Sequence, residues 1–245
     1  SFLQTFKTIF KTVSQVRRFK KQRIKNIYCF FMKDPKSKVS KSRLRNSLND
    51  NNLVDEFNLH CLKIVKSNID ALNNEENKIV IINNSPNNDY LNELELLDLS
   101  ILNIKKDDIG KSMQEAYDIC APFCDNIILS GSDIPELTAD QLKDSLKYLS
   151  SSDSYIIGTD DGGFCCFVTK LKNLENVFSR VDYSTNHVLE DLIRYQYNTK
   201  KSDFKLVDVD TLDDLQSMYE NLKDKPTLTQ QQRDLIQFID KRKYA

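Results

Sequence analysis

The chain reads Asn126-Ile127-Ile128-Leu129-Ser130-Gly131-Ser132-Asp133-Ile134-Pro135-Glu136-Leu137 at the point that is most informative about its fold. Residues 126–130 have the apolar centre and the length of a buried strand. Gly131 and Pro135 then indicate a turn, so the carboxylate of Asp133 is expected at the carboxyl end of that strand. An α/β protein binds its ligands at this edge of the sheet, which makes Asp133 a candidate site residue.

Short apolar runs recur on both sides of this stretch and alternate with segments of helical character. Strands are expected at residues 26–32, 78–82, 97–102, 126–130, 154–158, 164–168 and 204–207. Helices are expected at residues 41–72, 109–121, 186–197 and 211–222, with one opened by Thr138 and a polar one beyond Pro226. This alternation predicts an α/β fold with a mainly parallel sheet and helices on both faces.

The chain is poor in glycine, and the glycines it keeps lie in motif-like strings. It has five, all between Gly110 and Gly163, where average usage predicts about 17. Asp161 directly precedes Gly162 and Gly163 at the end of another predicted strand, so one of the pair is expected to have a positive φ or a close backbone neighbour. We expect Asp133 and Asp161 to approach one shared cleft.

A basic loop follows the first strand, at residues 33–43. Lys33, Lys41 and Arg43 suit the binding of phosphate at a helix N-terminus, although a solvated lysine-rich loop has the same composition. A carboxylate such as Asp133 can bind a hard divalent cation, and that cation would neutralise a diphosphate. Turn formation alone is the alternative interpretation of each acidic motif.

As an ordered set, these strings resemble a family of small GT-A-type glycosyltransferases, long known only as a domain of unknown function. Bacterial members read approximately K-x-P-x-x-G-x-V-K-T-R-L, D-L-G-x-R-M, G-S-D-x-P-x-L, D-G-G-Y, W-S-T-x-x-V-L and D-x-D-T-x-x-D-L. The corresponding strings here occupy residues 33–44, 108–113, 131–137, 161–164, 183–189 and 208–215. The resemblance covers about residues 27 to 224.

This resemblance implies a GT-A-like nucleotide-diphospho-sugar transferase fold that binds a nucleotide sugar. It implies that Asp133 binds Mg²⁺ or Mn²⁺ and that Asp161 is the catalytic residue, on the acceptor or donor-sugar side. The implied substrate-binding residues are Lys33, Lys41, Arg43, Gly162, Gly163, Ser184 and Thr185.

Some positions depart from the family pattern. Lys38 replaces the loop glycine, while Phe164 and Tyr183 replace a tyrosine and a tryptophan. An active glycosyltransferase requires Lys38 to turn away from the phosphate site. A non-catalytic accessory subunit of a mitochondrial, membrane-associated assembly would have Lys38 in the pocket. A nucleotidyltransferase is a further alternative, because residues 41–44 also resemble guanylyltransferases of related fold.

Composition predicts three parts of the chain: a basic arm at 1–25, a GT-A-like domain at 26–224 and a helical tail at 225–245. The arm holds eight basic residues and an apolar stripe, with no acidic residue before Asp34. It is typical of a mitochondrial transit segment or a docking arm. We expect the arm and tail to contact other protein chains, with a membrane surface as a further candidate contact of the arm. A nucleic-acid partner is not expected. Mitochondrial localisation is predicted, with cytoplasmic as the alternative.

The six cysteines show no paired spacing, so buried reduced thiols are expected. Cys120 and Cys124 have the spacing of a metal pair, but the two histidines of the chain, His60 and His187, are remote in sequence. A zinc site is therefore not favoured.

Overall fold

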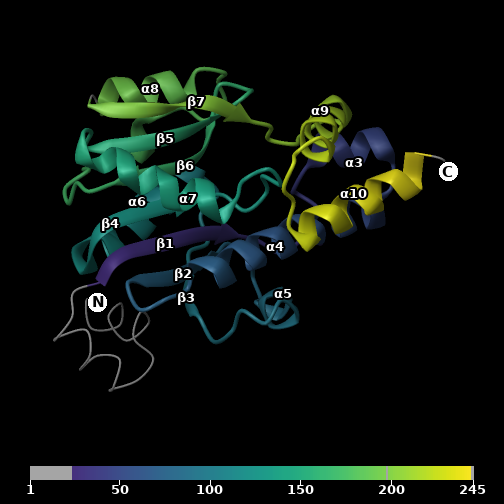
Figure 1. Ribbon diagram of the computed structural model, residues 1–245, viewed down its shortest axis with the longest axis horizontal. Helices are drawn as coiled ribbons and strands as arrows, with labels where there is room; N and C mark the ends of the chain where they lie inside the picture. The colour runs from purple at the N-terminus through teal and green to yellow at the C-terminus, as the bar shows by residue number, and fades with distance from the viewer. Residues whose placement is uncertain (1–23, 197, 244–245) are drawn as a thin grey trace.

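The computed structural model describes residues 24–196 and 198–243 (Figure 1). The strands are β1 (Ile24–Met32), β2 (Asn77–Asn83), β3 (Ser100–Asn103), β4 (Cys124–Ser130), β5 (Ser154–Thr159), β6 (Phe164–Thr169) and β7 (Thr199–Leu206). They form one sheet in the order β3-β2-β1-β4-β6-β5-β7. Strand β6 is antiparallel to both neighbours, and the other pairs are parallel. The predicted mainly parallel sheet is therefore confirmed.

The helices are α3 (Ser42–Leu48), α4 (Asn51–Leu72), α5 (Asp89–Glu93), α6 (Ile109–Cys120), α7 (Ala139–Ser145), α8 (Val188–Tyr195), α9 (Leu212–Lys223) and α10 (Gln230–Lys243). Short 3-10 helices occupy Ala121–Phe123, Leu146–Ser150 and Phe178–Arg180. The prediction of a single helix at 41–72 is wrong, because the helix is interrupted between α3 and α4. Asn49 there has a φ of 49°, and Asp50 caps α4 by accepting a hydrogen bond from the Leu53 amide.

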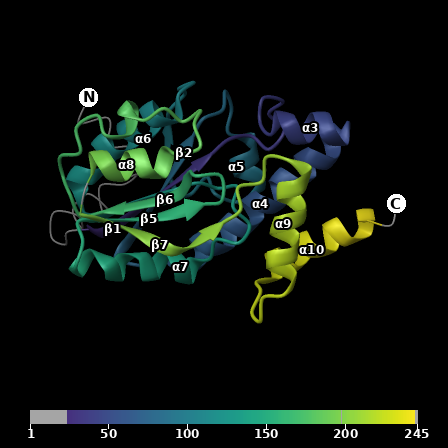
Figure 2. The same cartoon turned by 90° about the horizontal axis from the view of Figure 1, so that it is seen from above.

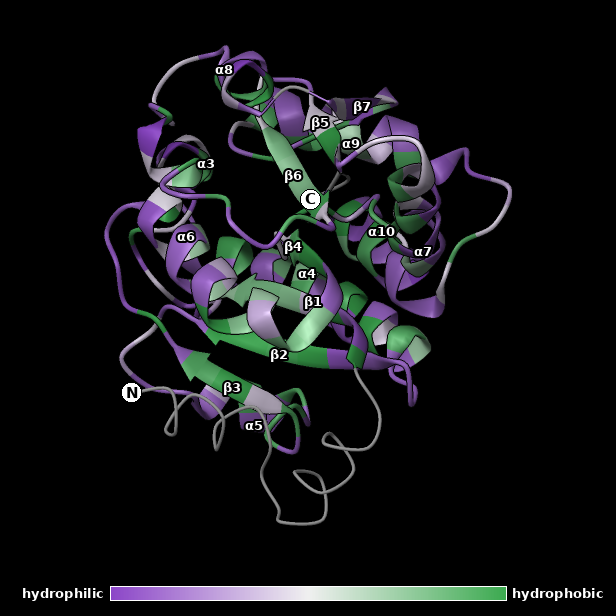
Figure 3. Ribbon diagram, turned by 90° about the vertical axis from the view of Figure 1, so that its left-hand side faces the viewer, coloured by the Kyte–Doolittle hydropathy of each residue, from purple (hydrophilic) through white to green (hydrophobic). Residues whose placement is uncertain are grey.

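Helices cover both faces of the sheet. Ile27 and Cys29 of β1 pack in a cluster with α6 and α8, whereas Tyr28 and Phe30 pack in another cluster with α4, α5 and α7. Figure 2 shows α6 and α8 on one side of the strands and α7 on the other. Because β1 is buried from both sides, its sequence is continuously apolar. Figure 3 shows hydrophobic residues gathered along the central strands.

A third apolar cluster lies beyond one end of the sheet, where α3, α9 and α10 gather around α4 (Figure 1). Leu235 and Phe238 of α10 are buried there with Cys61 of α4 and Met218 of α9. The segment expected as a C-terminal tail thus packs into the same core as the preceding helices.

Two further expectations concern the arm and the thiols. The arm at 1–25 lies almost wholly outside the described residues. All six cysteines are buried and free, as expected. Among residues 24–196 and 198–243, none of the helices combines the length and apolar character needed to cross a membrane.

Candidate functional site

A cavity of about 450 Å³ opens at the carboxyl edge of the sheet, the edge at which the parallel strands end. Lys33 follows β1, Asp133 follows β4, Asp161 follows β5 and Asp208 follows β7, and all four line this cavity. The strand order reverses between β1 and β4, because β2 and β3 continue to one side and the later strands to the other. Ligands of open α/β sheets bind at this type of switch point.

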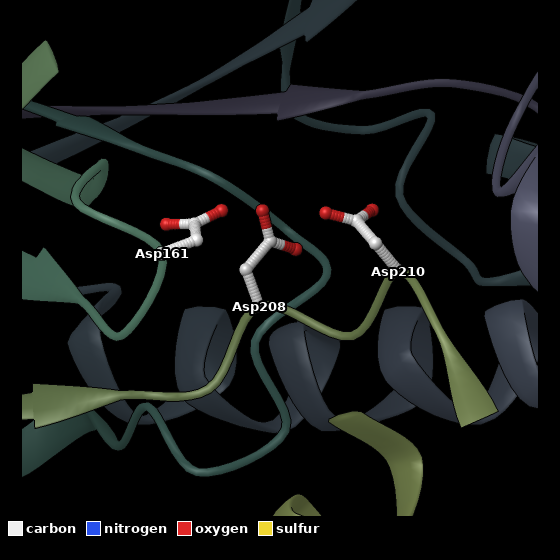
Figure 4. A group of neighbouring side chains, drawn as sticks. All are labelled: Asp161, Asp208 and Asp210. Carbon is white, nitrogen blue, oxygen red and sulfur yellow. The ribbon is translucent and has the colours of Figure 1, made fainter. Parts of the chain in front are cut away.

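Three carboxylates converge in the cavity. Asp161, Asp208 and Asp210 each offer an oxygen, and these oxygens lie within 4.8 Å of one another. Figure 4 shows the three side chains in a row, with Asp161 on one loop and the other two on the segment after β7. Oxygen ligands of this kind are those that Mg²⁺ prefers in proteins.

The turn after β5 fixes the first of these carboxylates. Asp161 Oδ1 accepts hydrogen bonds from Thr159 Oγ1 at 2.6 Å and from the Gly163 amide at 3.0 Å. Gly162 has a φ of 84°, and a Cβ there would lie 1.7 Å from the carbonyl oxygen of Asn186. The expectation of a positive φ in this glycine pair is therefore confirmed at Gly162, and the turn tolerates no side chain there.

The third apolar cluster, around α4, α9 and α10, fixes the positions of Asp208 and Asp210. Val207 and Val209 are 3% and 0% exposed, and both belong to the cluster around α9 and α10, while Asp208 between them lines the cavity. The amide of Asp210 donates to Asp214 Oδ2 at 3.0 Å. Asp214 also completes a capping box with Thr211, the predicted start of α9.

Lys41 supplies a buried cation beside the acids. Its side chain is 6% exposed, and its Nζ lies 3.5 Å from Asp133 Oδ2 and donates to the Val209 carbonyl. Lys41 has a φ of 53°, uncommon for a residue other than glycine. Burial would lower the pKa of Lys41, but the carboxylates of Asp133 and Asp208 together raise it above its ordinary value.

The acids repel one another. Burial raises the pKa of Asp208 to about 8, the nearby Asp133 carboxylate adds to the rise, and Lys41 opposes it. Burial also raises the pKa of Asp210, again opposed by Lys41. Asp208 Oδ1 is buried and has no hydrogen-bond partner among the described residues. An incompletely neutralised carboxylate group with an unpartnered oxygen fits the binding of a hard divalent cation.

The structure brings most of the expected site residues together. Asp133 and Asp161 line one cavity, with Lys33, Lys41, Gly163 and Thr185 also on its wall. Arg43 is exposed and lies 3.5 Å from Asp210. Gly162 and Ser184 do not line the cavity. Ser184 Oγ instead donates to Asp182 Oδ1 at 2.6 Å.

The three-carboxylate group differs in membership from the expected metal-binding residue, Asp133, whose role stays a prediction. Asp133, expected to bind the cation, lies beside Lys41 and outside the three-carboxylate group. Asp161, expected as the catalytic residue, is inside it. Asp208 and Asp210 belong to the motif at 208–215 but are not among the expected site residues. Two aspartates alternating directly after a strand, Asp208-Val209-Asp210, were the signal that could have identified them.

The three residues expected to depart from the family pattern occupy distinct places. Lys38 does not line the cavity; it is exposed and lies 3.4 Å from Asp55 of α4. Phe164 and Tyr183 do line it. The Tyr183 hydroxyl donates to the Phe178 carbonyl at 2.7 Å, which leaves its ring on the cavity wall.

This sheet order and this site define a nucleotide-diphospho-sugar transferase-like fold, as expected. The chain resembles the crystal structure of a candidate nucleotide-diphospho-sugar transferase from Desulfovibrio desulfuricans, with a TM-score of 0.70, 22% identity, and coverage of 89% of this chain and 97% of that one. A cytidylyltransferase from Leptospira borgpetersenii is also similar, with a TM-score of 0.55, 13% identity, and coverage of 91% and 96%. At these identities the likeness establishes the fold.

Sequence comparison also finds relatives of this chain. Residues 70–185 match the family described as "Uncharacterized protein conserved in bacteria (DUF2064)". The match confirms part of the expected resemblance to a family of unknown function. The chain is also 28% identical over 167 residues to the 2-phospho-L-lactate guanylyltransferase of Methanobrevibacter smithii, covering 66% of this chain and 73% of that protein.

Proposed function

We propose that this protein is a metal-dependent transferase that acts on a nucleotide sugar and transfers its glycosyl group to an acceptor hydroxyl. The observation that carries the proposal is the convergence of Asp161, Asp208 and Asp210 in the cavity at the switch point of the sheet. A nucleotide-diphospho-sugar transferase-like fold with such a group is equipped to bind a nucleoside diphosphate through a cation.

Asp161, Asp208 and Asp210 would hold the cation, Mg²⁺ or Mn²⁺. When bound, such an ion stabilises the negative charge that develops on a departing diphosphate. Thr159 and Gly163 orient the Asp161 carboxylate toward this position. Lys33, on the wall, and Arg43, beside Asp210, would contact phosphate oxygens.

The position of Lys38 supports a functional site. A non-catalytic subunit was expected to have this side chain in the pocket, whereas Lys38 lies outside it and pairs with Asp55. The phosphate side of the cavity is therefore not closed by the bulky residue that replaces the family's glycine.

Nucleotidyl transfer is the second candidate, supported by the similarity to the M. smithii guanylyltransferase. The charge of the cavity wall favours glycosyl transfer. Among residues 24–196 and 198–243, the basic residues on it are Lys33 and Lys41, and the acidic ones are Asp34, Asp133, Asp161, Asp208 and Asp210. A phosphorylated acceptor would meet these carboxylates, and the described part of the wall offers no basic side chain beyond the two lysines to receive it, whereas a neutral hydroxyl needs none.

Calorimetry with Mn²⁺ and a panel of nucleotide sugars and nucleoside triphosphates tests the proposal. The full chain should bind a nucleotide sugar only when Mn²⁺ or Mg²⁺ is present. The Asp208→Asn variant should lose this metal-dependent binding. Release of a nucleoside diphosphate identifies glycosyl transfer, while release of pyrophosphate from a triphosphate identifies nucleotidyl transfer. Absence of binding to every nucleotide, with metal present, would contradict both and favour the accessory-subunit hypothesis.

A further inference from the structure

Glu136 is a buried carboxylate that the proposed function does not use. Glu136 is only 3% exposed, although it lies three positions after Asp133 in the loop that follows β4. Burial raises the pKa of Glu136, and the Val207 amide and Lys225 oppose that rise. A carboxylate so deeply buried is costly, so the contacts that hold it there are informative.

The contacts of Glu136 join two segments that carry site acids. Glu136 Oε2 accepts a hydrogen bond from the Val207 amide at 3.2 Å, and Val207 directly precedes Asp208. Glu136 Oε1 lies 4.0 Å from Lys225 Nζ, just after α9. One side chain thus connects the Asp133 loop to the backbone that presents Asp208 and Asp210.

The Asp133 loop is anchored independently on its outer side. Asn68 Nδ2 of α4 donates to the Leu137 carbonyl at 2.9 Å, and Gln232 Nε2 of α10 donates to the Pro135 carbonyl at 3.0 Å. Both amide side chains are buried. These bonds hold the loop to α4 and α10, whereas the hydrogen bond of Glu136 joins the loop directly to the Val207 backbone.

We infer that Glu136 is a positioning residue for the metal site, acting through the Val207 amide to set where Asp208 and Asp210 lie. The inference rests on the proposed function in that the three carboxylates are taken as the ligands. Lys41 makes the corresponding link on the cavity side, between Asp133 and the Val209 carbonyl. The two links hold the backbone just before and just after Asp208, at Val207 and Val209.

The test compares Glu136→Ala with Glu136→Gln in the full chain, with Mn²⁺ alone as the probe. Removal of a residue that orients metal ligands typically weakens metal affinity about 10- to 100-fold, and we expect this for E136A. E136Q keeps an oxygen that can accept from the Val207 amide, so its affinity should stay within about threefold of wild type. Unchanged affinity in a folded E136A variant would overturn the inference.

Leu72→Ala is the matched control for lost stability. Leu72 is fully buried at the far end of α4, next to the start of β2 and away from the carboxyl edge. L72A should lower the melting temperature at least as much as E136A and leave Mn²⁺ affinity unchanged. An equal loss of affinity in L72A would mean that E136A acts through general destabilisation.

Hydrogen exchange separates failure of this inference from failure of the proposed function. If wild type binds no Mn²⁺, the metal site itself is wrong. The positioning role then still requires that E136A speed up amide exchange in residues 131–137 and 207–210 together, while E136Q and L72A leave those segments unchanged. Unaltered exchange in both segments would overturn the inference.

Discussion

Lys41 Nζ lies 3.5 Å from Asp133 Oδ2, and Lys41 is buried whereas Asp133 is exposed. The charge of Lys41 is thus held inside the wall of the cavity, beneath an acid that remains open to solvent. Lys41 also donates to the Val209 carbonyl, so it links α3, the Asp133 loop and the Asp208 segment.

Lys41→Met should therefore destabilise the protein while preserving most of the side-chain volume. The Val209 carbonyl would lose its buried donor, which costs about 1–3 kcal/mol. The contribution of the Asp133 pair itself should be small, because that carboxylate is exposed. Urea denaturation measures the change. Asp133→Asn is the control. A larger loss of unfolding free energy in D133N than in K41M would contradict the view that the Val209 carbonyl, rather than the Asp133 pair, accounts for most of the effect.

The Asp208→Asn substitution should raise the stability of the fold at high pH and abolish Mn²⁺ binding. An ordinary aspartate has a pKa of about 3.9, and burial raises the pKa of Asp208 to about 8. The folded state therefore holds a proton that the unfolded state has lost, so stability falls as pH rises between these values. The variant removes this fall and should gain more at pH 8 than at pH 4.

Thermal melts of wild type and D208N across that pH range measure the difference. A gain of about 1 kcal/mol corresponds to roughly 2–4 °C in a domain of this size. An equal gain at both pH values would show that the proton on Asp208 is not the cause. If the same variant is more stable but no longer binds Mn²⁺, Asp208 serves metal binding rather than the stability of the fold.

Gly162→Ala should be strongly destabilising. Its φ of 84° disfavours any side chain, and the added Cβ would overlap the Asn186 carbonyl oxygen. The backbone strain alone costs about 1–3 kcal/mol, and the overlap adds to it. Gly131→Ala is the matched control, since a Cβ there has its nearest contacts at 3.6 Å. Similar melting temperatures for the two variants would contradict the role of Gly162 in the turn.

Lys33 and Lys38 provide a test of where phosphate binds. Lys33 lines the cavity and Lys38 does not, so Lys33→Ala should weaken nucleotide affinity and Lys38→Ala should not. One charge-assisted hydrogen bond contributes about 1.5–3 kcal/mol, or roughly 10- to 100-fold in affinity. Calorimetry with the best-bound nucleotide measures both. The reverse order would place the phosphates on the outer side of the loop.

Most of the strands were predictable because they are short apolar runs, and β1, buried by helices on both faces, shows this most clearly. Strand β7 was expected at 204–207 but begins at Thr199, because its first residues are polar and give no apolar signal. The break between α3 and α4 was not predictable, because Asn49 and Asp50 are only weak signals against a strongly periodic background. The grouping of Asp161 with Asp208 and Asp210 depends on β7 pairing with β5 in parallel. That pairing joins segments about 45 residues apart, and local sequence patterns do not specify it. The sequence therefore identified Asp161 without its two neighbours.

The burial of α10 against α4 and α9 has a consequence for biosynthesis. Val207 and Val209, which flank Asp208, share their apolar cluster with Leu235 and Phe238 of α10. Domains are synthesised from the N-terminus, so the helix that completes this cluster is the last described element to leave the ribosome. The acids at positions 208 and 210 thus acquire their full support only after α10 has left the ribosome, because a nascent chain without α10 lacks the side chains that pack against Val207 and Val209.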